Sequence, residues 1–466
     1  MPWSVRASLL FTMLVSGCAS APNPPEIAPA ATAQLLVNSV SIVDPDTGTT
    51  SAPHDILIQD GRIAAIGAAG SLAVPRGTPR IDGAGRFAIP GLIDVHAHLG
   101  EGGLARGSEA TRDRALRQFL RYGVTSIFAP GGGGASDAAW PALRQHCRST
   151  VASCPGLYGS GSLITAPGSH PVSTIFDMPA DVPAPAVEAL GVTMLQPGTD
   201  LDALITAKRK AGADAIKIVV EDGPPPWYPK PRLSNEQIRA IIQAAHAQSL
   251  PVFSHVSTAD HVRVAVAAGV DGIMHSPLDR LPDDLVRLMA ERRTWYVPTF
   301  ALYDGLLTWS RKQREPDAYA IKGVDPSVLE SLAAAGFLNA APQSEADALR
   351  YLANASDNLR RVAAAGVPVA LGSDVNNPFV YPGHSAHEEL SWMVLAGLTP
   401  VQALRAGTLG GASFLRNETR IGRIATGYEA DLVLLARNPL ERIENSRTIV
   451  AVIADGHLIP NVVSQD

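Results

Sequence analysis

The middle of this chain alternates short apolar runs, rich in β-branched residues, with longer stretches that have helical spacing. Such alternation is typical of βα units joined into a parallel sheet, because each strand is followed by a helix that returns the chain to the same edge. Eight predicted strands occupy residues 88–95, 124–128, 157–164, 215–219, 252–255, 272–275, 295–299 and 369–372. Eight such units predict an α/β fold, a (β/α)8 TIM-like barrel over residues 88–412. The Ala- and Leu-rich segment 301–365 predicts a helical insertion in this barrel.

Both flanks of the predicted barrel differ from its middle, because they contain short predicted strands without intervening helices. Short apolar runs bounded by turn residues occupy residues 35–37, 56–58, 62–66, 432–435 and 449–453. Turn residues at this spacing are typical of short strands that pair with their neighbours. We therefore expect residues 35–87 and 413–466 to form one small β-sandwich domain, built from both ends of the chain.

The start of the chain has the pattern of an export signal. Arg6 precedes an apolar run at 9–15, which is too short to cross a bilayer, and small residues lead into Cys18. The segment around Cys18 resembles a bacterial lipobox, which implies a signal peptide over residues 1–17 and lipidation of Cys18. An ordinary secretory signal, cut a few residues later, is the alternative. Residues 18–34 are rich in Ala and Pro and predict a tether.

The same segment predicts where the protein is found. A lipid on Cys18 would anchor a folded body at a membrane without a spanning helix. Ala19 stands where an aspartate would retain a lipoprotein in the inner membrane, which favours the outer membrane and a body that faces the periplasm. No other apolar stretch reaches the length of a membrane span. We expect an exported protein that meets the membrane only through its lipid anchor.

Cysteine content and charge add two constraints. If Cys18 carries the lipid, Cys147 and Cys154 remain, in a compartment that would be oxidising. A disulfide between them is predicted, and two free thiols are the alternative. The chain has 38 Lys and Arg against 44 Asp and Glu, which gives a formal net charge of −6. This mild acidity argues against a nucleic-acid surface, which would need clustered basic residues.

The residues that can carry chemistry gather at one end of the predicted strands. His96 and His98 are two positions apart on the first strand, so both imidazoles point to the same side and can chelate a divalent cation. The other metal-competent groups lie in later strands or at their ends: Lys217, His255, His275 and Asp374. In barrels of this type the C-terminal ends of the strands form the active site. The six residues together therefore predict a metal centre.

These six residues resemble the metal ligands of the amidohydrolase superfamily. A second match lies near the end of the chain, where the spacing of Gly422, Ile424, Gly427 and Asp431 resembles the segment that returns to the family's β-sandwich. The resemblance covers about residues 35–460. Within the superfamily, the middle of the chain most resembles the imidazolonepropionase-related, Xaa-Pro-dipeptidase-like carboxypeptidases, through segments 215–218, 269–275, 297–299 and 395–400.

The resemblance implies a site with two divalent metal ions. The histidine pair of the first strand would hold one ion together with Asp374, and His255 and His275 would hold the other. Lys217 would bridge the two ions after CO2 converts its amine into a carbamate, because an unmodified ammonium repels cations. Zinc is the default metal for histidine and carboxylate ligands, although manganese or cobalt could replace it.

The same resemblance suggests the reaction and the residues that serve it. A water that bridges two cations loses a proton near neutral pH, and the resulting hydroxide attacks a carbonyl whose oxyanion the metals stabilise. Asp374 would pass the proton to the leaving amine, unless it is a ligand only. His170, after the third strand, and Tyr228, in the Pro-rich loop after Lys217, are candidate substrate contacts. A solvated loop histidine and a tyrosine that packs the loop are the alternatives.

We expect an exported, metal-dependent amidohydrolase that cleaves the C–N amide bond of a small molecule, either a dipeptide or an N-acyl amino acid. A lactonase, an esterase or a phosphotriesterase could use the same metals. A deaminase fits less well, because residues 256–258 after His255 include no acid. A non-catalytic binding lipoprotein fits least, because all six metal-site residues are present. No nucleic-acid partner is expected, and assembly into a homo-oligomer is left open.

Overall fold

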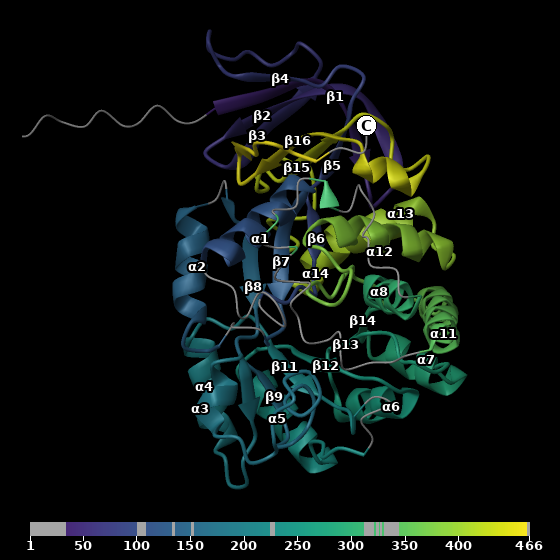
Figure 1. Cartoon of the computed structure of the whole chain (residues 1–466). Helices are drawn as coiled ribbons and strands as arrows, with labels where there is room; N and C mark the ends of the chain where they lie inside the picture. Colours follow the sequence, from purple (N-terminus) through teal and green to yellow (C-terminus); the bar gives the residue numbers. More distant parts are fainter. Residues whose placement is uncertain are drawn as a thin grey trace, which may run out of the picture.

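The structure is a computed structural model that describes residues 34–99, 109–132, 136–150, 153–223, 229–311 and 344–463, with positions 321, 322, 326 and 329 between the last two ranges. The predicted signal peptide and the tether up to residue 33 lie outside the described residues, and with them Cys18. Tyr228 lies outside them too. The described residues form two regions, and Figure 1 shows a sheet at the top above parallel strands surrounded by helices.

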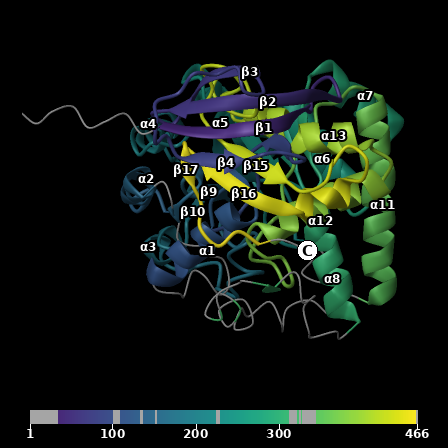
Figure 2. The ribbon, with the colours of Figure 1, turned by 90° about the horizontal axis from the view of Figure 1, so that it is seen from above.

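The upper region is a single eight-stranded sheet, here called the end sheet. Its strands are β1 (Gln34–Asp44), β2 (Thr49–Gln59), β3 (Arg62–Ala68), β4 (Arg80–Asp82), β5 (Phe87–Pro90), β15 (Leu432–Leu435), β16 (Ile449–Ala454) and β17 (His457–Leu458). They run in the order β17-β16-β15-β5-β1-β2-β3, and β4 pairs with β1. In the view from above, β1, β2 and β3 lie side by side (Figure 2). The two ends of the chain meet directly, since β15 pairs antiparallel with β5.

A sandwich was predicted for these strands, whereas the structure joins them in one curled sheet. The long strand β1 explains the difference. Its pairing with β2 shifts register between Val37 and Val40 and again between Ser41 and Val43, and such bulges bend a strand and increase its twist. On its other edge, β1 pairs in turn with β4 and β5. The apolar core enclosed by the curl includes Val37, Val40, Ile56, Ile58, Ile63, Leu432, Leu434 and Ile453.

The lower region contains two parallel sheets. One has three strands, in the order β6 (Leu92–Asp94), β7 (Val124–Ala129) and β8 (Gly156–Gly159). The other has six strands, in the order β10 (Val192–Met194), β9 (Leu163–Thr165), β11 (Ile216–Val219), β12 (Val252–His255), β13 (Gly272–Met274) and β14 (Trp295–Val297). Neighbouring strands are parallel throughout both sheets, which is the pairing that βα alternation predicts.

The predicted strand 88–95 is divided between the two regions. Its first half is β5 of the end sheet, and its second half is β6 of the three-stranded parallel sheet. The division falls at Gly91, whose N–H donates to the carbonyl of Asp431 at 2.9 Å. A Cβ on Gly91 would lie 2.1 Å from Oγ1 of Thr125, so only glycine allows this close approach to β7. The predicted boundary at residue 88 therefore lies within β5.

Two other predicted strands also differ from the structure. Residues 157–164 form β8 and β9, which are separated at Gly161, where a φ of +62° is not extended and favours glycine. Residues 369–372 form only an isolated bridge, between Val369 and Tyr296 of β14. The short strand β10 was not predicted, because three residues are too few to show a period.

Backbone hydrogen bonds connect the two parallel sheets, one of them directly and the other through the bridged segment 369–372. On one side, the N–H of Asp214, just before β11, donates to the carbonyl of Gly159 at 2.8 Å. On the other side, the N–H of Val95, just after β6, donates to the carbonyl of Leu371 at 2.8 Å. The strands thus curl around a shared interior. They form two sheets and a bridged segment, so the closed eight-stranded barrel stays a prediction.

Helices surround the parallel strands on their outer side (Figure 1). The segment 301–365, which was predicted to be a helical insertion, contains α11 and all of α8 except its first residue, and the described parts of that segment are largely helical. Across the described ranges, no helix is long and apolar enough to cross a membrane. The helices are α1 (Glu109–Arg121), α2 (Trp140–Ser149), α3 (Ala184–Glu188), α4 (Leu201–Lys210), α5 (Asn235–Ala247), α6 (Ala259–Ala268), α7 (Asp283–Glu291), α8 (Phe300–Ser310), α11 (Glu345–Ala364), α12 (His384–Leu395), α13 (Pro400–Arg405) and α14 (Gly411–Phe414).

Cys147 and Cys154 form a disulfide, with their Cα atoms 5.1 Å apart. Cys147 lies in the last turn of α2, Cys154 lies shortly before β8, and both are buried. The structure thus pairs the two cysteines for which a disulfide is predicted. The bond ties a helix to the N-terminal end of the following strand.

Candidate active site

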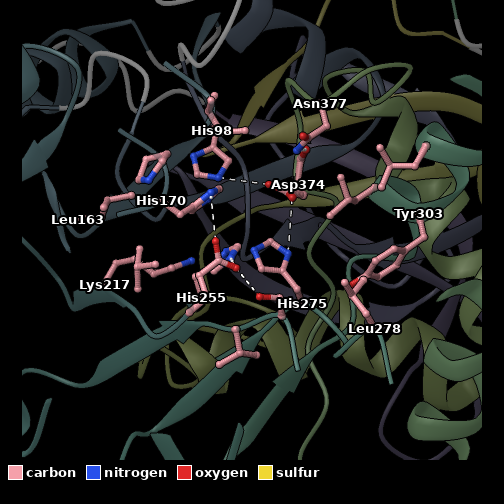
Figure 3. A pocket seen from close by; sticks show the side chains of 18 of the residues that line it. His98, Leu163, His170, Lys217, His255, His275, Leu278, Tyr303, Asp374 and Asn377 are labelled. Atoms are coloured by element: carbon pink, nitrogen blue, oxygen red, sulfur yellow. Dashed lines mark hydrogen bonds and ion pairs between the residues drawn. The ribbon is translucent and has the colours of Figure 1, made fainter. Parts of the chain in front are cut away.

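A cavity of about 170 Å³ lies at the C-terminal ends of the parallel strands (Figure 3). Five of the six predicted metal ligands line it, and the sixth, His96, contacts His98. The polar and charged residues of its lining are His98, His170, Lys217, Glu221, His255, Ser257, His275, Asp374 and Asn377. The strand ends therefore place the predicted residues around one space.

The first group of ligand atoms comes from His96, His98 and Asp374. The two histidines follow β6, and their Nε2 atoms are 3.2 Å apart. Oδ1 of Asp374 lies 3.3 Å from Nε2 of His96 and 3.2 Å from Nε2 of His98. All three side chains are buried. The N–H of Asp374 donates to the carbonyl of His96 at 2.8 Å, so the backbone holds the carboxylate beside the histidine pair.

A hydrogen bond to the backbone determines which ring nitrogen of His98 carries the lone pair. Nδ1 of His98 lies 2.7 Å from the carbonyl oxygen of Gly131, which can only accept, so Nδ1 carries the proton and Nε2 the lone pair. This lone pair and the Asp374 carboxylate converge on the same point beside Nε2 of His96. Two acceptors so close repel each other unless a proton or a cation lies between them. The donor set therefore fits a divalent metal ion.

A second group of ligand atoms includes Glu221, which the sequence analysis did not single out. Glu221 follows β11 and is fully buried. Its Oε2 lies 2.8 Å from Nε2 of His255, and its Oε1 lies 3.3 Å from Nδ1 of His170. Ser257 donates a further hydrogen bond to Oε2. The rings of His170 and His255 stack with centroids 4.5 Å apart, and the ligand atoms of the three residues lie within 4.8 Å of one another.

His275 lies between the two groups. Its ring centroid is 4.6 Å from that of His96 and 4.6 Å from that of His255. Its Nδ1 lies 3.0 Å from Oγ1 of Thr299 and 3.6 Å from Oδ2 of Asp374. The imidazole thus has neighbours in both groups of ligand atoms.

Lys217 extends from β11 towards these imidazoles and is almost completely buried. Its Nζ lies 3.0 Å from Sδ of Met274. Burial, followed by the charge of Lys217, holds the pKa of His96 well below its usual range. Burial and the charges of His255 and Lys217 do the same for the pKa of His275. Both imidazoles are therefore neutral at physiological pH and can offer lone pairs to a cation.

Asp94 connects the two segments that carry the first group. Its Oδ1 accepts hydrogen bonds from the N–H groups of His96 and Ser373, both at 3.0 Å. Burial raises the pKa of Asp94 to about 6, against hydrogen bonds that lower it. The carboxyl group thereby fixes the start of the histidine pair relative to the residue that precedes Asp374.

The sequence pattern of the amidohydrolase family matches residues 87–459, a range that includes both groups of ligand atoms. This chain belongs to the amidohydrolase family. Ochratoxinase from Aspergillus niger is 25% identical to this amidohydrolase over 76% of this chain and 71% of the ochratoxinase. Imidazolonepropionase from Mycolicibacterium smegmatis is 27% identical over 87% of this chain and 91% of its own length. The crystal structure of a Xaa-Pro dipeptidase with bound methionine has a TM-score of 0.70 at 24% identity and covers 91% of this chain and 99% of that chain.

Family membership sets the general chemistry of this amidohydrolase. Members of the family are hydrolases that act on C–N bonds and typically bind divalent metals. Its structural neighbours imply a TIM barrel with an attached β-domain, a fold with which the curled parallel strands and the end sheet are consistent. The two groups of ligand atoms are the residues of this chain that could hold such metals.

The structure places all six predicted ligands and His170 at this site, but not Tyr228, which lies outside the described residues. Their roles stay predictions. Glu221 is the residue that the sequence analysis missed. It directly follows the apolar run 218–220, but this position alone does not show that the side chain enters the cavity.

Proposed function

We propose that this amidohydrolase hydrolyses the C–N amide bond of a small molecule, either a dipeptide or an N-acyl amino acid, with two divalent cations in the cavity. The convergence of two groups of ligand atoms on one cavity carries the proposal. A structural relative described as a Xaa-Pro dipeptidase supports a substrate with a peptide-like bond. The same proposal includes the closure of the parallel strands into a (β/α)8 barrel, whose C-terminal end would form the site.

The residues of the cavity divide between the two cations. The histidine pair after β6 and Asp374 hold one, while His255 and His275 hold the other, beside the carboxylate of Glu221. Zinc suits this set of imidazole and carboxylate donors. The ammonium of Lys217 repels cations, but after it loses a proton its amine would add to CO2 with release of a second proton, and the resulting carbamate would offer two ligand oxygens. Cations bound here supply Lewis acidity for the substrate carbonyl and lower the pKa of water.

Asp374 is suited to move the proton. One of its oxygens faces the histidine pair, and the other lies 3.6 Å from Nδ1 of His275. Its carboxylate also lines the cavity, so it can accept the proton of the attacking water and pass it to the leaving nitrogen. The backbone hydrogen bond to His96 keeps it in place during this transfer.

His170 is suited to hold the substrate. Burial lowers its pKa to about 4, against the charge of Glu221, so the ring is neutral at physiological pH. Its Nδ1 faces Glu221 and Oγ1 of Thr174, and a carboxylate partner places the proton on Nδ1. Nε2 is then an acceptor on a residue that lines the cavity, where it can receive an N–H of the substrate.

Metal analysis and amine release test the proposal together. We expect the purified, zinc-loaded chain to hold two metal ions and to release amine from Xaa-Pro or Xaa-Arg dipeptides or from N-acyl amino acids. Asp374→Asn should keep its metal and lose activity by roughly 10²- to 10⁴-fold, the usual contribution of a proton-transfer group. Turnover of esters or lactones alone would point to the lactonase alternative. A Lys217→Ala variant that keeps full metal content and activity would contradict the proposal that a carbamate on Lys217 bridges two metal ions.

We propose in addition that the protein is exported and anchored by a lipid on Cys18. The disulfide between Cys147 and Cys154 supports an oxidising compartment. In bacterial cells that express the full chain, labelled palmitate should enter the wild-type protein and not the Cys18→Ser variant. Equal labelling of both proteins, or of neither, would contradict the anchor.

A further inference from the structure

One wall of the cavity is apolar and lies apart from the ligand atoms. Figure 3 shows Tyr303 and Leu278 beside His275 and Asp374, on the side away from Lys217. Most of this wall comes from α8 (Phe300–Ser310), and α11 (Glu345–Ala364) and the loop after β13 complete it. The α8 wall, as it is called below, consists of Leu278, Leu302, Tyr303, Leu306 and Tyr351.

Two leucines of the α8 wall keep apolar surface open towards the cavity. Leu302 and Leu306 are four residues apart on one helix, so they lie on the same face. Both pack against the core and yet stay only partly buried. Apolar surface that lines a cavity favours an apolar ligand, because binding removes that surface from water.

Tyr303 contributes a ring rather than a hydroxyl group to the α8 wall. Its side chain is buried, and its hydroxyl donates to the carbonyl of Ser276. The hydroxyl is thus engaged away from any substrate. The ring face is what a ligand would meet, and it suits an aromatic or aliphatic group.

The α8 wall also lacks charge. Among the described residues that line the cavity, Lys217 is the only lysine or arginine, and Glu221 and Asp374 are the only carboxylates. All three lie with the ligand atoms rather than on the α8 wall. A charged substrate group placed against the α8 wall would lose its water without meeting an opposite charge there, which is costly.

Packing of α8 keeps the wall at a fixed distance from Asp374. Gly305 is buried in the middle of the helix, and a Cβ at this position would lie 2.2 Å from the carbonyl oxygen of Pro378. At the start of the helix, the N–H of Ala301 donates to the buried carboxyl of Glu389 at 2.8 Å. The α8 wall is therefore formed before a substrate arrives.

We propose that the α8 wall is the specificity pocket of this enzyme and binds a bulky, uncharged aliphatic or aromatic group of the substrate. The proposal rests on the amide hydrolysis proposed above and narrows its substrate class. Preferred substrates are amides with such a group on the side of the scissile bond that faces α8. Amides that would place only a small or charged group there are poor substrates.

Two matched series of substrates test the proposal on the metal-loaded full chain. One consists of N-acyl-L-alanines with acetyl, butyryl, hexanoyl and benzoyl groups, and the other of N-acetyl derivatives of Gly, Ala, Leu and Phe. In one series, kcat/KM should rise roughly 10- to 200-fold from the smallest to the largest group, the range for apolar discrimination in a pocket. A flat profile in both series would overturn the proposal.

Variants link this preference to α8. Leu306→Trp fills the pocket and should lower kcat/KM for the largest substrate by a larger factor than for the smallest, so that the gain from the large group is lost. Leu302→Phe should act in the same direction and serves if the tryptophan variant does not fold. Leu349→Ala on α11 is the matched control, because this leucine is 46% exposed and does not line the cavity. Equal losses for small and large substrates in both pocket variants would contradict the proposal.

A binding measurement separates this proposal from the proposed function. If no amide of either series is cleaved, the proposed hydrolysis fails, and calorimetry with acetanilide and acetamide on the same metal-loaded protein still tests the pocket. If acetanilide binds to the wild type and no longer binds to Leu306→Trp, the apolar pocket is supported even though the proposed hydrolysis has failed. Equal binding of acetanilide to both proteins, or to neither, would overturn it.

Discussion

At the scale of single residues, the second group of ligand atoms is built around a carboxylate between two imidazoles. Glu221 contacts His255 and His170 and accepts a hydrogen bond from Ser257. Burial alone would raise its pKa, but the charge of His255 and the hydrogen bonds from His255 and Ser257 lower it. A buried, ionised carboxylate needs positive charge close by, which a divalent cation supplies. Glu221 therefore joins the residues of the cavity that could hold a metal ion.

The first prediction concerns the charge of Glu221. Glu221→Gln keeps the shape of the side chain and removes its charge, so the second cation should bind roughly 10- to 100-fold more weakly, as is usual when a partner of a metal ligand is lost. Zinc titration with metal analysis measures this loss. Ser257→Ala, which removes one hydrogen bond to the same carboxylate, is the control and should weaken binding less. Two tightly held ions in the glutamine variant would exclude Glu221 from metal binding.

Residues at the ends of clear strands could be predicted from the sequence, and Glu221 could not. β12 ends at His255 in both the prediction and the structure. The position of His255 at the C-terminal end of a strand was therefore enough to predict that its side chain lies at the site. Glu221 stands two residues beyond the end of β11, where no periodicity tells whether a side chain turns inward. The argument against a deaminase considered only the residues after His255, whereas the acid that reaches His255 follows β11.

At the scale of elements, the position of α8 depends on the absence of one side chain. Gly305 is buried where the helix meets the segment after Asp374, and a Cβ there would approach the carbonyl oxygen of Pro378 to 2.2 Å and Cγ2 of Val380 to 3.3 Å. A backbone carbonyl cannot rotate away as a side chain can. The helix therefore approaches this segment more closely than any larger residue would allow.

The second prediction concerns this contact. Gly305→Ala should displace α8 and lower the free energy of unfolding by about 1–3 kcal/mol, the usual cost of overpacking, despite the better helix propensity of alanine. Urea-induced unfolding measures the change. Thr308→Ala on the same helix is the control and should be close to neutral. An unchanged or raised unfolding midpoint for Gly305→Ala would show that the helix can move without cost.

Elements with their own periodicity could be predicted, and those that depend on tertiary pairing could not. The predicted strands 252–255 and 124–128 appear as β12 and β7 with little change. Residues 369–372 have the same kind of sequence, but the structure gives them only an isolated bridge. Strand assignment depends on the alignment of neighbours, and an apolar run alone does not specify that alignment.

At the scale of the whole molecule, Asp431 lies where the end sheet meets the parallel strands. Its carbonyl accepts from Gly91, and its Oδ1 accepts from the N–H of Asp455 at 2.8 Å. Burial raises the pKa of Asp431 to about 7, although the hydrogen bond from Asp455 lowers it. A carboxyl group with a raised pKa stabilises the fold fully below its unfolded pKa, and this contribution is lost as the pH rises through the folded pKa.

The third prediction follows from this sign. Between about pH 4 and pH 7, Asp431 should lower the free energy of unfolding by up to about 4 kcal/mol, since one pKa unit corresponds to about 1.4 kcal/mol. Asp431→Asn keeps the acceptor for Asp455 and should make stability depend less on pH in this window. Urea unfolding at several pH values measures the slope, and the exposed Asp181→Asn is the control. Parallel pH profiles for wild type and Asp431→Asn would contradict the raised pKa.

The chain passes at Gly91 from the end sheet straight into the parallel strands, and this limits how the protein can be divided. β5 is held by β1 on one edge and by β15 on the other, and the chain then runs directly into β6 and the histidine pair. The first metal-ligand candidates are thus positioned by strands from both ends of the sequence. The parallel strands and their helices cannot be excised as an independent piece. Any cut that separates them from the end sheet also releases β5, the segment that positions His96 and His98. Engineers who wish to graft new substrate loops onto this scaffold should therefore carry the two ends of the chain along as part of the minimal unit.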